Sequence, residues 1–285
     1  MVTLTEKQRA ADYLESQFDV SERRACKVIT ISRNSKRLRR EQPINEIERL
    51  VIDLSENEPR WGYRKVHDRL RLNGQRIGRE RVRLIRRREG LQVRKKQHRK
   101  RHPGNSGELI QAEYPNHVWT YDFVMDQTMD GRRLKALTIV DEFTRIGLDI
   151  VVSRSLTHIG VKSALQRLFS QHGRPAYIRS DNGGEFISTE IRKWLSRQGV
   201  APHYIDPGSP WQNGYGESFN SIFRDDCLNR WIFRSPREAR MVVSQWLKKY
   251  NGYRPHGSLD GITPNMFLGK WRQASVTLET RVAET

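Results

Sequence analysis

Apolar side chains in the first ninety residues recur at intervals of three and four, which places them on one face of a helix. Such runs cover residues 7–18, 21–28 and 33–40. A second set of three helices is expected from the apolar positions Ile47, Leu50, Val51 and Leu54, then Tyr63, Val66 and Leu70, then Val82 and Ile85. Each set predicts a small unit of the helix-turn-helix kind, although two purely structural helical hairpins would show the same spacing.

Beyond residue 112 the pattern changes to short apolar runs that alternate with amphipathic segments. Strands are expected at 118–125, 135–141, 147–152, 176–180 and near 202–205, and helices at 157–171, 188–198, around Glu217 and at 237–250. Three consecutive strands followed by alternating helices and strands are typical of a mixed sheet with flanking helices. We therefore predict an α/β domain in this part of the chain.

The stretch between the two patterns predicts a linker. Residues 95–107 combine basic side chains with Pro103, two glycines, Asn105 and Ser106, a composition that cannot bury a core. The predicted organisation is a helix-turn-helix-like segment (1–42), a helix-turn-helix-like DNA-binding module (43–95), a basic linker (96–111), the α/β domain (112–272) and a loosely ordered polar tail (273–285).

The net charge of the chain indicates the kind of molecule that it binds. The chain carries a formal net charge of +19, and residues 60–101 alone hold 18 basic side chains against three acidic ones. Basic surfaces gain affinity for nucleic acid by releasing counterions from its phosphates, so we expect double-stranded DNA as the partner. Basic helices also bind anionic membranes, but these lack a broad aromatic face. The predicted DNA contacts in the module are Arg79, Arg83, Arg86 and Arg87.

Other classes of protein are disfavoured by composition. Cys26 and Cys227 stand about two hundred residues apart, without the spacing of a zinc site or a disulfide framework. No apolar run approaches the roughly 20 residues of a bilayer span, and the first fifteen residues lack the apolar stretch of a signal peptide. We expect no membrane association and a cytoplasmic, nucleoid-associated protein.

Three carboxylates carry the candidate chemistry. Asp122, Asp181 and Glu217 occur in WTYDFV, IRSDNGGEF and PWQNGYGESFNSIFRD, with 35 residues between the second and the third. Gathered carboxylates repel one another, so a fold that brings three together usually does so around hard cations. The pattern predicts a site for Mg²⁺ or Mn²⁺, with two ions, that performs phosphoryl transfer.

These motifs resemble the DDE catalytic core of bacterial IS3-family transposases, which are related to retroviral integrases. The resemblance extends over residues 45–270, from PRWGYRKVHDRLRLNGQRIGRERVRLIRRREGLQVR to YNGYRPHGSLDGITPNMF. It implies an RNase H-like core that cleaves the ends of an insertion element and transfers the 3′-hydroxyl ends to DNA. It also implies terminal repeats and target DNA as partners, a homo-oligomer on DNA, and a helix-turn-helix and leucine-zipper subunit from an upstream reading frame.

Other residues near the motifs are weaker candidates. Arg224 lies two helical turns after Glu217, and the resemblance implies that it grips a terminal DNA phosphate; an ordinary solvent-facing arginine would look the same. Asn182, Gln212 and Asn213 are further candidates for DNA contact. Arg254 and His256 fit DNA contact or closure of the core equally well. We expect no metal-binding role for Asp141, Glu142, Glu185 or Asp206.

Two rival functions remain open to test. The letters GGEF at 183–186 also occur in diguanylate cyclases, but four residues are a weak match and the surrounding motif explains them. A noncatalytic or regulatory DNA-binding protein derived from an insertion element would keep the basic module, although it would not need three carboxylates.

Overall fold

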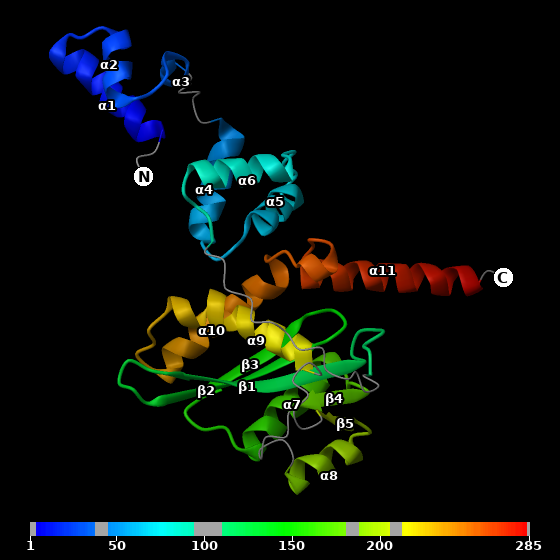
Figure 1. Cartoon of the computed structure of the whole chain (residues 1–285). Helices are drawn as coiled ribbons and strands as arrows, with labels where there is room; N and C mark the ends of the chain where they lie inside the picture. The colour runs from blue at the N-terminus through cyan, green and yellow to red at the C-terminus, as the bar shows by residue number, and fades with distance from the viewer. Residues whose placement is uncertain (1–3, 38–44, 94–109, 181–187, 206–212, 284–285) are drawn as a thin grey trace. The chain divides into compact units, whose positions relative to one another are not determined.

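The computed structural model describes residues 4–37, 45–93, 110–180, 188–205 and 213–283 (Figure 1). They belong to two compact units, residues 1–50 and 51–285. Within the described ranges, no helix combines the length and the apolar composition that a bilayer span requires.

The first unit holds three short helices, α1 (Leu4–Phe18), α2 (Glu22–Ile29) and α3 (Arg33–Arg37). Ser21 caps α2 by accepting a hydrogen bond from the Arg24 amide. Ala11, Ala25 and Cys26 are buried between the helices. The three helices predicted from the sequence are confirmed.

A second group of three helices precedes the sheet: α4 (Glu46–Asn57), α5 (Tyr63–Leu72) and α6 (Arg79–Arg88). Gly74 adopts a left-handed conformation with φ +82° just after α5, which lets the chain turn there. The predicted apolar positions are largely buried, namely Val51, Val66, Leu70, Val82 and Ile85.

A five-stranded mixed sheet forms the centre of the second unit. Its strands are β1 (Val118–Gln127), β2 (Arg133–Asp141), β3 (Gly147–Ser153), β4 (Tyr177–Ser180) and β5 (Ala201–Tyr204). Their order is β3-β2-β1-β4-β5. The first three strands pair antiparallel, whereas β4 pairs parallel with β1 and β5 parallel with β4. This is the RNase H-like arrangement that the resemblance implies.

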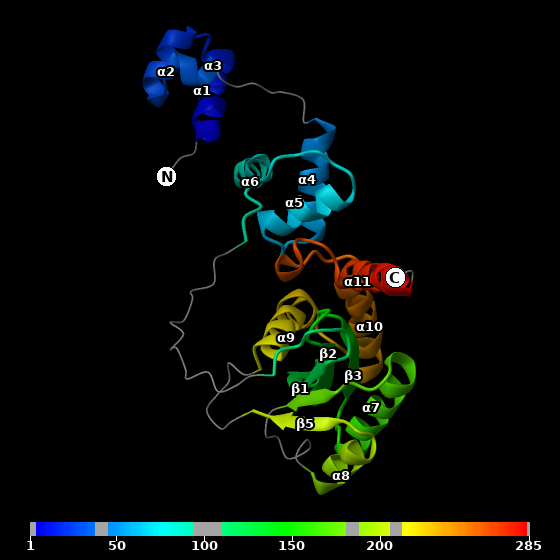
Figure 2. The same cartoon turned by 90° about the vertical axis from the view of Figure 1, so that its right-hand side faces the viewer.

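Helices cover both faces of the sheet (Figures 1 and 2). On one face, α7 (His158–His172) and α8 (Thr189–Arg197) enclose an apolar cluster with β1 and β2. On the other, α9 (Gly214–Asp226) and α10 (Pro236–Gly252) pack on β2 and β3 through a second cluster that includes Phe219, Phe223 and Trp246. The central strand β1 is therefore enclosed on both sides.

Two short 3₁₀ turns, Leu228–Arg230 and Gly257–Leu259, flank α10, and the long helix α11 (Pro264–Ala283) follows the second of them. The sequence predicts a loosely ordered tail from residue 273, and this is wrong as far as the backbone is concerned. The segment continues the helix because residues 264–283 contain no glycine or proline between Gly269 and Ala283 that would end it.

Candidate active site

Asp122 lies on the central strand β1 and faces α9. Side chains alternate along a strand, so Asp122 points to the opposite side from Tyr121 and Phe123. Its Oδ1 accepts a hydrogen bond from the Phe123 amide at 2.7 Å, and its Oδ2 accepts one from Asn220 Nδ2 at 2.8 Å. A half-buried carboxylate is thus held by two donors in a fixed orientation.

Asn220 and Thr138 complete this arrangement, and the sequence reasoning missed both. Thr138 stands opposite Asp122 in the β1–β2 register. Its hydroxyl donates to Asn220 Oδ1 at 2.8 Å, which orients the amide so that its nitrogen points to Asp122. Asn220 comes three residues after Glu217 on α9, and that spacing on one helix face was a signal available in the sequence.

Glu217 lies in the first turn of α9 with an exposed side chain. Residues three apart on a helix are neighbours, so Glu217 lies beside Asn220, which is bonded to Asp122. The amino-terminal end of a helix also favours a negative charge. The structure therefore brings Asp122 and Glu217 to the same side of the sheet.

Gly216 is the reason that α9 comes so close to β1. A Cβ atom added there would stand 2.6 Å from Asn213 Oδ1 and 3.1 Å from Thr120 Oγ1. The Thr120 hydroxyl donates to Asn213 Oδ1 at 2.8 Å. Asn213 is only 5 % exposed and its side chain fastens α9 to β1, so a role in positioning other groups agrees with its surroundings, while its contact with DNA stays a prediction.

The third carboxylate, Asp181, lies outside the described residues, as do Asn182 and Gln212. Asp181 directly follows β4, which pairs with β1 at Thr120 and Arg179. Among the residues that the structure describes, no three histidine, cysteine or acidic side chains form a group able to hold a metal ion. The geometry of the complete triad therefore stays a prediction.

A buried ion pair fixes the strand that leads to Asp181. Arg179 on β4 donates through Nη1 to both Glu142 oxygens at 2.9 and 2.8 Å, and through Nη2 to the Ile110 carbonyl at 2.6 Å. Burial raises the pKa of Glu142 to about 7, and the charge of Arg179 opposes this rise. Asp141 accepts bonds from the amides of Asn116 and Thr144, so both acids have structural partners in the described part of the chain.

Three further candidates have partners within the chain. Arg224 donates through Nη2 to the Met125 carbonyl at 2.6 Å, which ties α9 to the end of β1. Arg254 and His256 are 5 % and 7 % exposed, so closure of the core is the role that the structure supports for both. Burial also lowers the pKa of His256 to about 3, which keeps its ring neutral.

The four arginines predicted to contact DNA from the module differ in exposure. Arg79, Arg83 and Arg87 are exposed on α6, and Arg83 forms an ion pair with Glu80 on the same helix. Arg86 is 2 % exposed and donates through Nη2 to the Leu91 carbonyl at 2.5 Å. It lies on the buried side of α6 beside Val82 and Ile85, so packing is the role that the structure supports for it, and its DNA contact stays a prediction.

Known proteins match this chain in both of its predicted parts. Residues 37–101 match an HTH-like domain, and residues 112–210 and 198–264 match two models of the integrase core domain. The uncharacterized 31.7 kDa protein of insertion element IS407 from Burkholderia multivorans is 37 % identical over 262 residues, covering 91 % of this chain and 94 % of that protein. The chain belongs to the IS3 family of insertion-element transposases.

Two further comparisons agree with this membership. The uncharacterized 39.2 kDa protein of insertion element IS476 from Xanthomonas euvesicatoria is 36 % identical to this IS3-family chain, covering 93 % of it and 78 % of that protein. A chain in the solved simian T-cell lymphotropic virus intasome, in complex with a PP2A regulatory subunit, aligns with a TM-score of 0.51 at 18 % identity. That alignment covers 77 % of this chain and 74 % of the other, and it shows a shared fold.

Proposed function

We propose that this IS3-family protein is the catalytic subunit of a transposase, which cleaves DNA at the ends of an insertion element and joins the 3′-hydroxyl ends to target DNA. The observation that carries the proposal is the position of Asp122. A carboxylate on the central strand is held by Asn220 of α9, the helix that presents Glu217 one turn earlier. An arrangement that only closed a core would have no need of two acids on this side of the sheet.

The donor set fits a hard divalent cation. Carboxylate oxygens are the ligands that Mg²⁺ and Mn²⁺ prefer, and Asp122 and Glu217 supply them from two rigid elements. We expect these two, together with Asp181, to hold the metal. When bound, such ions activate a hydroxyl nucleophile and stabilise the leaving oxygen at a phosphodiester.

The described residues have separate tasks in this proposal. Asn220 and Thr138 keep the Asp122 carboxylate oriented before DNA arrives, which lowers the cost of reorganisation during the reaction. Exposed arginines on α6 bind DNA phosphates and bases. The strongly basic chain favours DNA as the partner. Membership of the IS3 family leads us to expect element ends and target DNA, with a homo-oligomer and an upstream-frame subunit assembling on the ends.

The proposal is tested with labelled DNA that carries the element's own ends, in the presence and absence of Mg²⁺. We compare wild type with Glu217→Gln, which removes one negative charge and keeps the shape of the side chain. The matched control is Glu190→Gln, because Glu190 is an exposed acid in the first turn of another helix, α8.

Wild type and Glu190→Gln are expected to release 3′-hydroxyl ends and to join them, whereas Glu217→Gln binds the DNA and does not cut it. If all three proteins bind and none cuts, even with the upstream-frame product added, the noncatalytic regulatory function is the better account. If Glu217→Gln cuts as fast as wild type, the assignment of Glu217 is wrong.

A further inference from the structure

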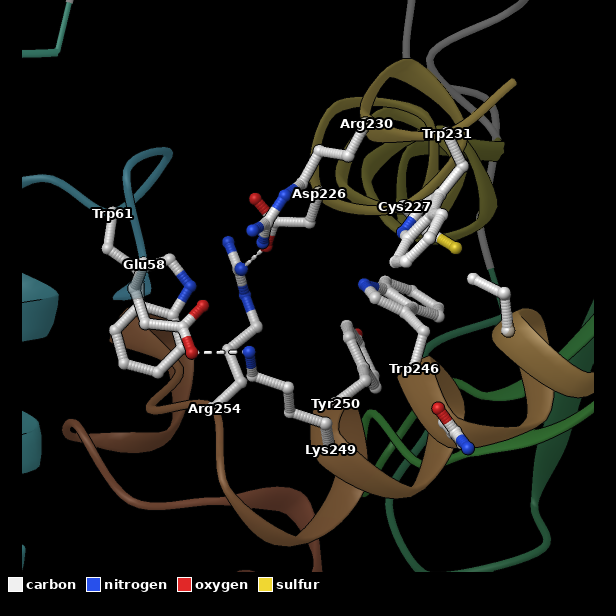
Figure 3. A pocket seen from close by; sticks show the side chains of 12 residues that line it. Glu58, Trp61, Asp226, Cys227, Arg230, Trp231, Trp246, Lys249, Tyr250 and Arg254 are labelled. Carbon is white, nitrogen blue, oxygen red and sulfur yellow. Dashed lines mark ion pairs between the residues drawn. The ribbon is translucent and has the colours of Figure 1, made fainter. Parts of the chain in front are cut away.

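The turn between α4 and α5 packs against the far end of α10 (Figure 3). Trp61 in this turn is 1 % exposed, and its ring centroid lies 5.8 Å from that of Tyr253. Glu58, also buried, forms an ion pair with Lys249 of α10. Figure 3 shows Glu58, Trp61 and Lys249 beside a cavity, whose volume is about 230 Å³ and which is also lined by residues of α9 and α10.

Helix α5 adds contacts along the same segment. The Arg69 guanidinium lies 3.8 Å from the centre of the Tyr253 ring, and the Arg71 guanidinium donates to the Asp260 carbonyl at 2.9 Å. Gly261 has a positive φ of +75°, and a Cβ atom there would stand 2.8 Å from the Asp68 carboxyl carbon. A side chain at position 261 would collide with the Asp68 side chain, so the Gly261 backbone lies directly against α5.

Buried charge makes this contact hard to open. Arg254 is 5 % exposed and forms an ion pair with Asp226, the last residue of α9. Burial, followed by the charge of Arg254, lowers the pKa of Lys65 of α5 to about 8. The pair that crosses the contact is Glu58–Lys249, and opening the contact would leave the buried Glu58 without this partner, which is costly.

These contacts also reach the candidate active site. Asp226 and Glu217 lie on the same helix, α9, nine residues apart. Arg254 pairs with the end of α9 and directly follows Tyr253, the residue that contacts α5. Contacts therefore run from α5 to Tyr253, from the adjacent Arg254 to α9, and from α9 to Asp122 on the sheet.

We propose that this contact is a positioning joint, which holds the DNA-binding helix α6 and the carboxylates of Asp122 and Glu217 in one rigid frame. The joint consists of Glu58, Trp61, Arg69, Arg71, Asp226, Lys249, Tyr253, Arg254 and Asp260. It fixes the number of base pairs between the DNA that α6 reads and the phosphate that is cut. This inference rests on the proposed function, because it concerns how the same site selects its phosphate.

The arginines of α5 and those of α6 look alike in the sequence, but their contacts differ. Arg69 and Arg71 of α5 donate to the carbonyls of Tyr253 and Asp260, although Arg71 is itself exposed, whereas Arg79, Arg83 and Arg87 lie exposed on α6. The noncovalent contacts of the joint act directly between the α4–α5 region and residues 249–261, and we infer that they set the spacing.

The first test needs no DNA. Spin labels are attached at Arg83→Cys on α6 and Lys193→Cys on α8, both exposed positions, and their separation is measured by pulsed electron paramagnetic resonance. Cys26 and Cys227 are buried, so the labels react at the introduced positions. The joint predicts one narrow distance distribution in the otherwise wild-type chain. A broad distribution there would overturn the joint, whatever the outcome for catalysis.

Four variants test whether the distance distribution depends on the joint. Tyr253→Ala removes the ring between Trp61 and Arg69 and is expected to broaden the distribution, whereas Tyr253→Phe keeps the ring and is expected to leave it narrow. Lys249→Glu places two acids together and is expected to broaden it, and adding Glu58→Lys is expected to restore it. Failure of the reversed pair to restore the narrow distribution would contradict the role of this ion pair.

The second test uses DNA in which one to ten base pairs are inserted between the region bound by α6 and the cleavage site. Five base pairs rotate the duplex by about half a turn, so the wild-type cleavage rate is expected to fall by about tenfold or more and to recover partly near ten. Tyr253→Ala is expected to cut all spacings at similar rates. Equal cleavage of all spacings by wild type would overturn the joint while leaving the proposed function intact, and no cleavage of any DNA would count against the proposed function alone.

Discussion

The two faces of strand β1 carry different kinds of side chain. Toward α7 and α8, Trp119, Tyr121 and Phe123 lie in or against an apolar cluster. Toward α9, Thr120 and Asp122 form hydrogen bonds to Asn213 and Asn220. Neighbouring residues here thus enter an apolar layer and a polar patch in turn, and further along β1 Val124 joins the second apolar cluster on the α9 side.

The apolar side chains mainly stabilise the fold, whereas the polar side chains mainly fix the geometry of the site. The apolar side stabilises the fold because it removes large side chains from water. A polar layer adds little net stability, since each of its hydrogen bonds replaces one to water, but it fixes the direction of every group. The polar patch of Thr120 and Asp122 on the α9 side of β1 therefore has the properties of a preorganised site, and the α7 side has those of a core.

The largest expected effect comes from Asp122→Asn. We expect DNA cleavage to fall by on the order of 10³-fold or more, because the variant keeps the size of the side chain but loses one acceptor and the negative charge that a metal needs. The free energy of unfolding, measured by urea denaturation, is expected to change little. Cleavage at the wild-type rate would remove Asp122 from the site.

A smaller loss is expected for Asn220→Ala. The Asp122 carboxylate loses one of its two described donors, and partners of this kind typically contribute about 10- to 100-fold to activity or metal affinity. The measurement is the cleavage rate as a function of Mg²⁺ concentration, which is expected to shift to higher metal. Asn229→Ala, at an exposed position beyond α9, serves as the control and should match wild type.

Gly216→Ala tests whether the spacing of α9 from β1 matters. The added methyl would meet Asn213 and Thr120, and overpacking of this kind costs about 1–3 kcal/mol. Cleavage by the folded variant should fall severalfold because α9 carries Glu217. Gly214→Ala is the matched change on the same helix, since nothing lies within 4 Å of its added Cβ, and an equal effect of both would exclude the steric explanation.

The smallest effect on turnover is expected on the opposite face of the sheet. Leu165→Ala in α7 removes a fully buried side chain from the apolar cluster and should lower the free energy of unfolding by about 2–5 kcal/mol. The cleavage rate per folded molecule should remain that of wild type. A large loss of turnover at full folding would mean that the apolar face also shapes the site.

Much of the fold followed from the sequence because local patterns determine it. The alternation of the strands and the spacing of Val51, Val66 and Val82 depend on residues close together in the chain, and the structure confirms them. Arg86 shows that periodicity indicates the buried face even for a charged residue. It stands four residues after Val82, and that spacing places it on the buried face of α6.

The contacts that position the site depend on tertiary pairing. Thr138 faces Asp122 only because of the β1–β2 register, and Arg179 meets Glu142 only when β4 lies beside β1. Arg69 of α5 meets Tyr253 across more than 180 residues of chain. No local pattern encodes such pairs, so they were absent from the sequence reasoning.

The most direct test of the central claim measures Asp122→Asn and Leu165→Ala side by side, with cleavage rate and unfolding free energy determined for each. The account predicts opposite results: Asp122→Asn stays folded and does not cut DNA, whereas Leu165→Ala is less stable and cuts normally when folded. If cleavage declined in both variants only in proportion to the loss of folded protein, the assignment of chemistry to the α9 face of β1 would be contradicted.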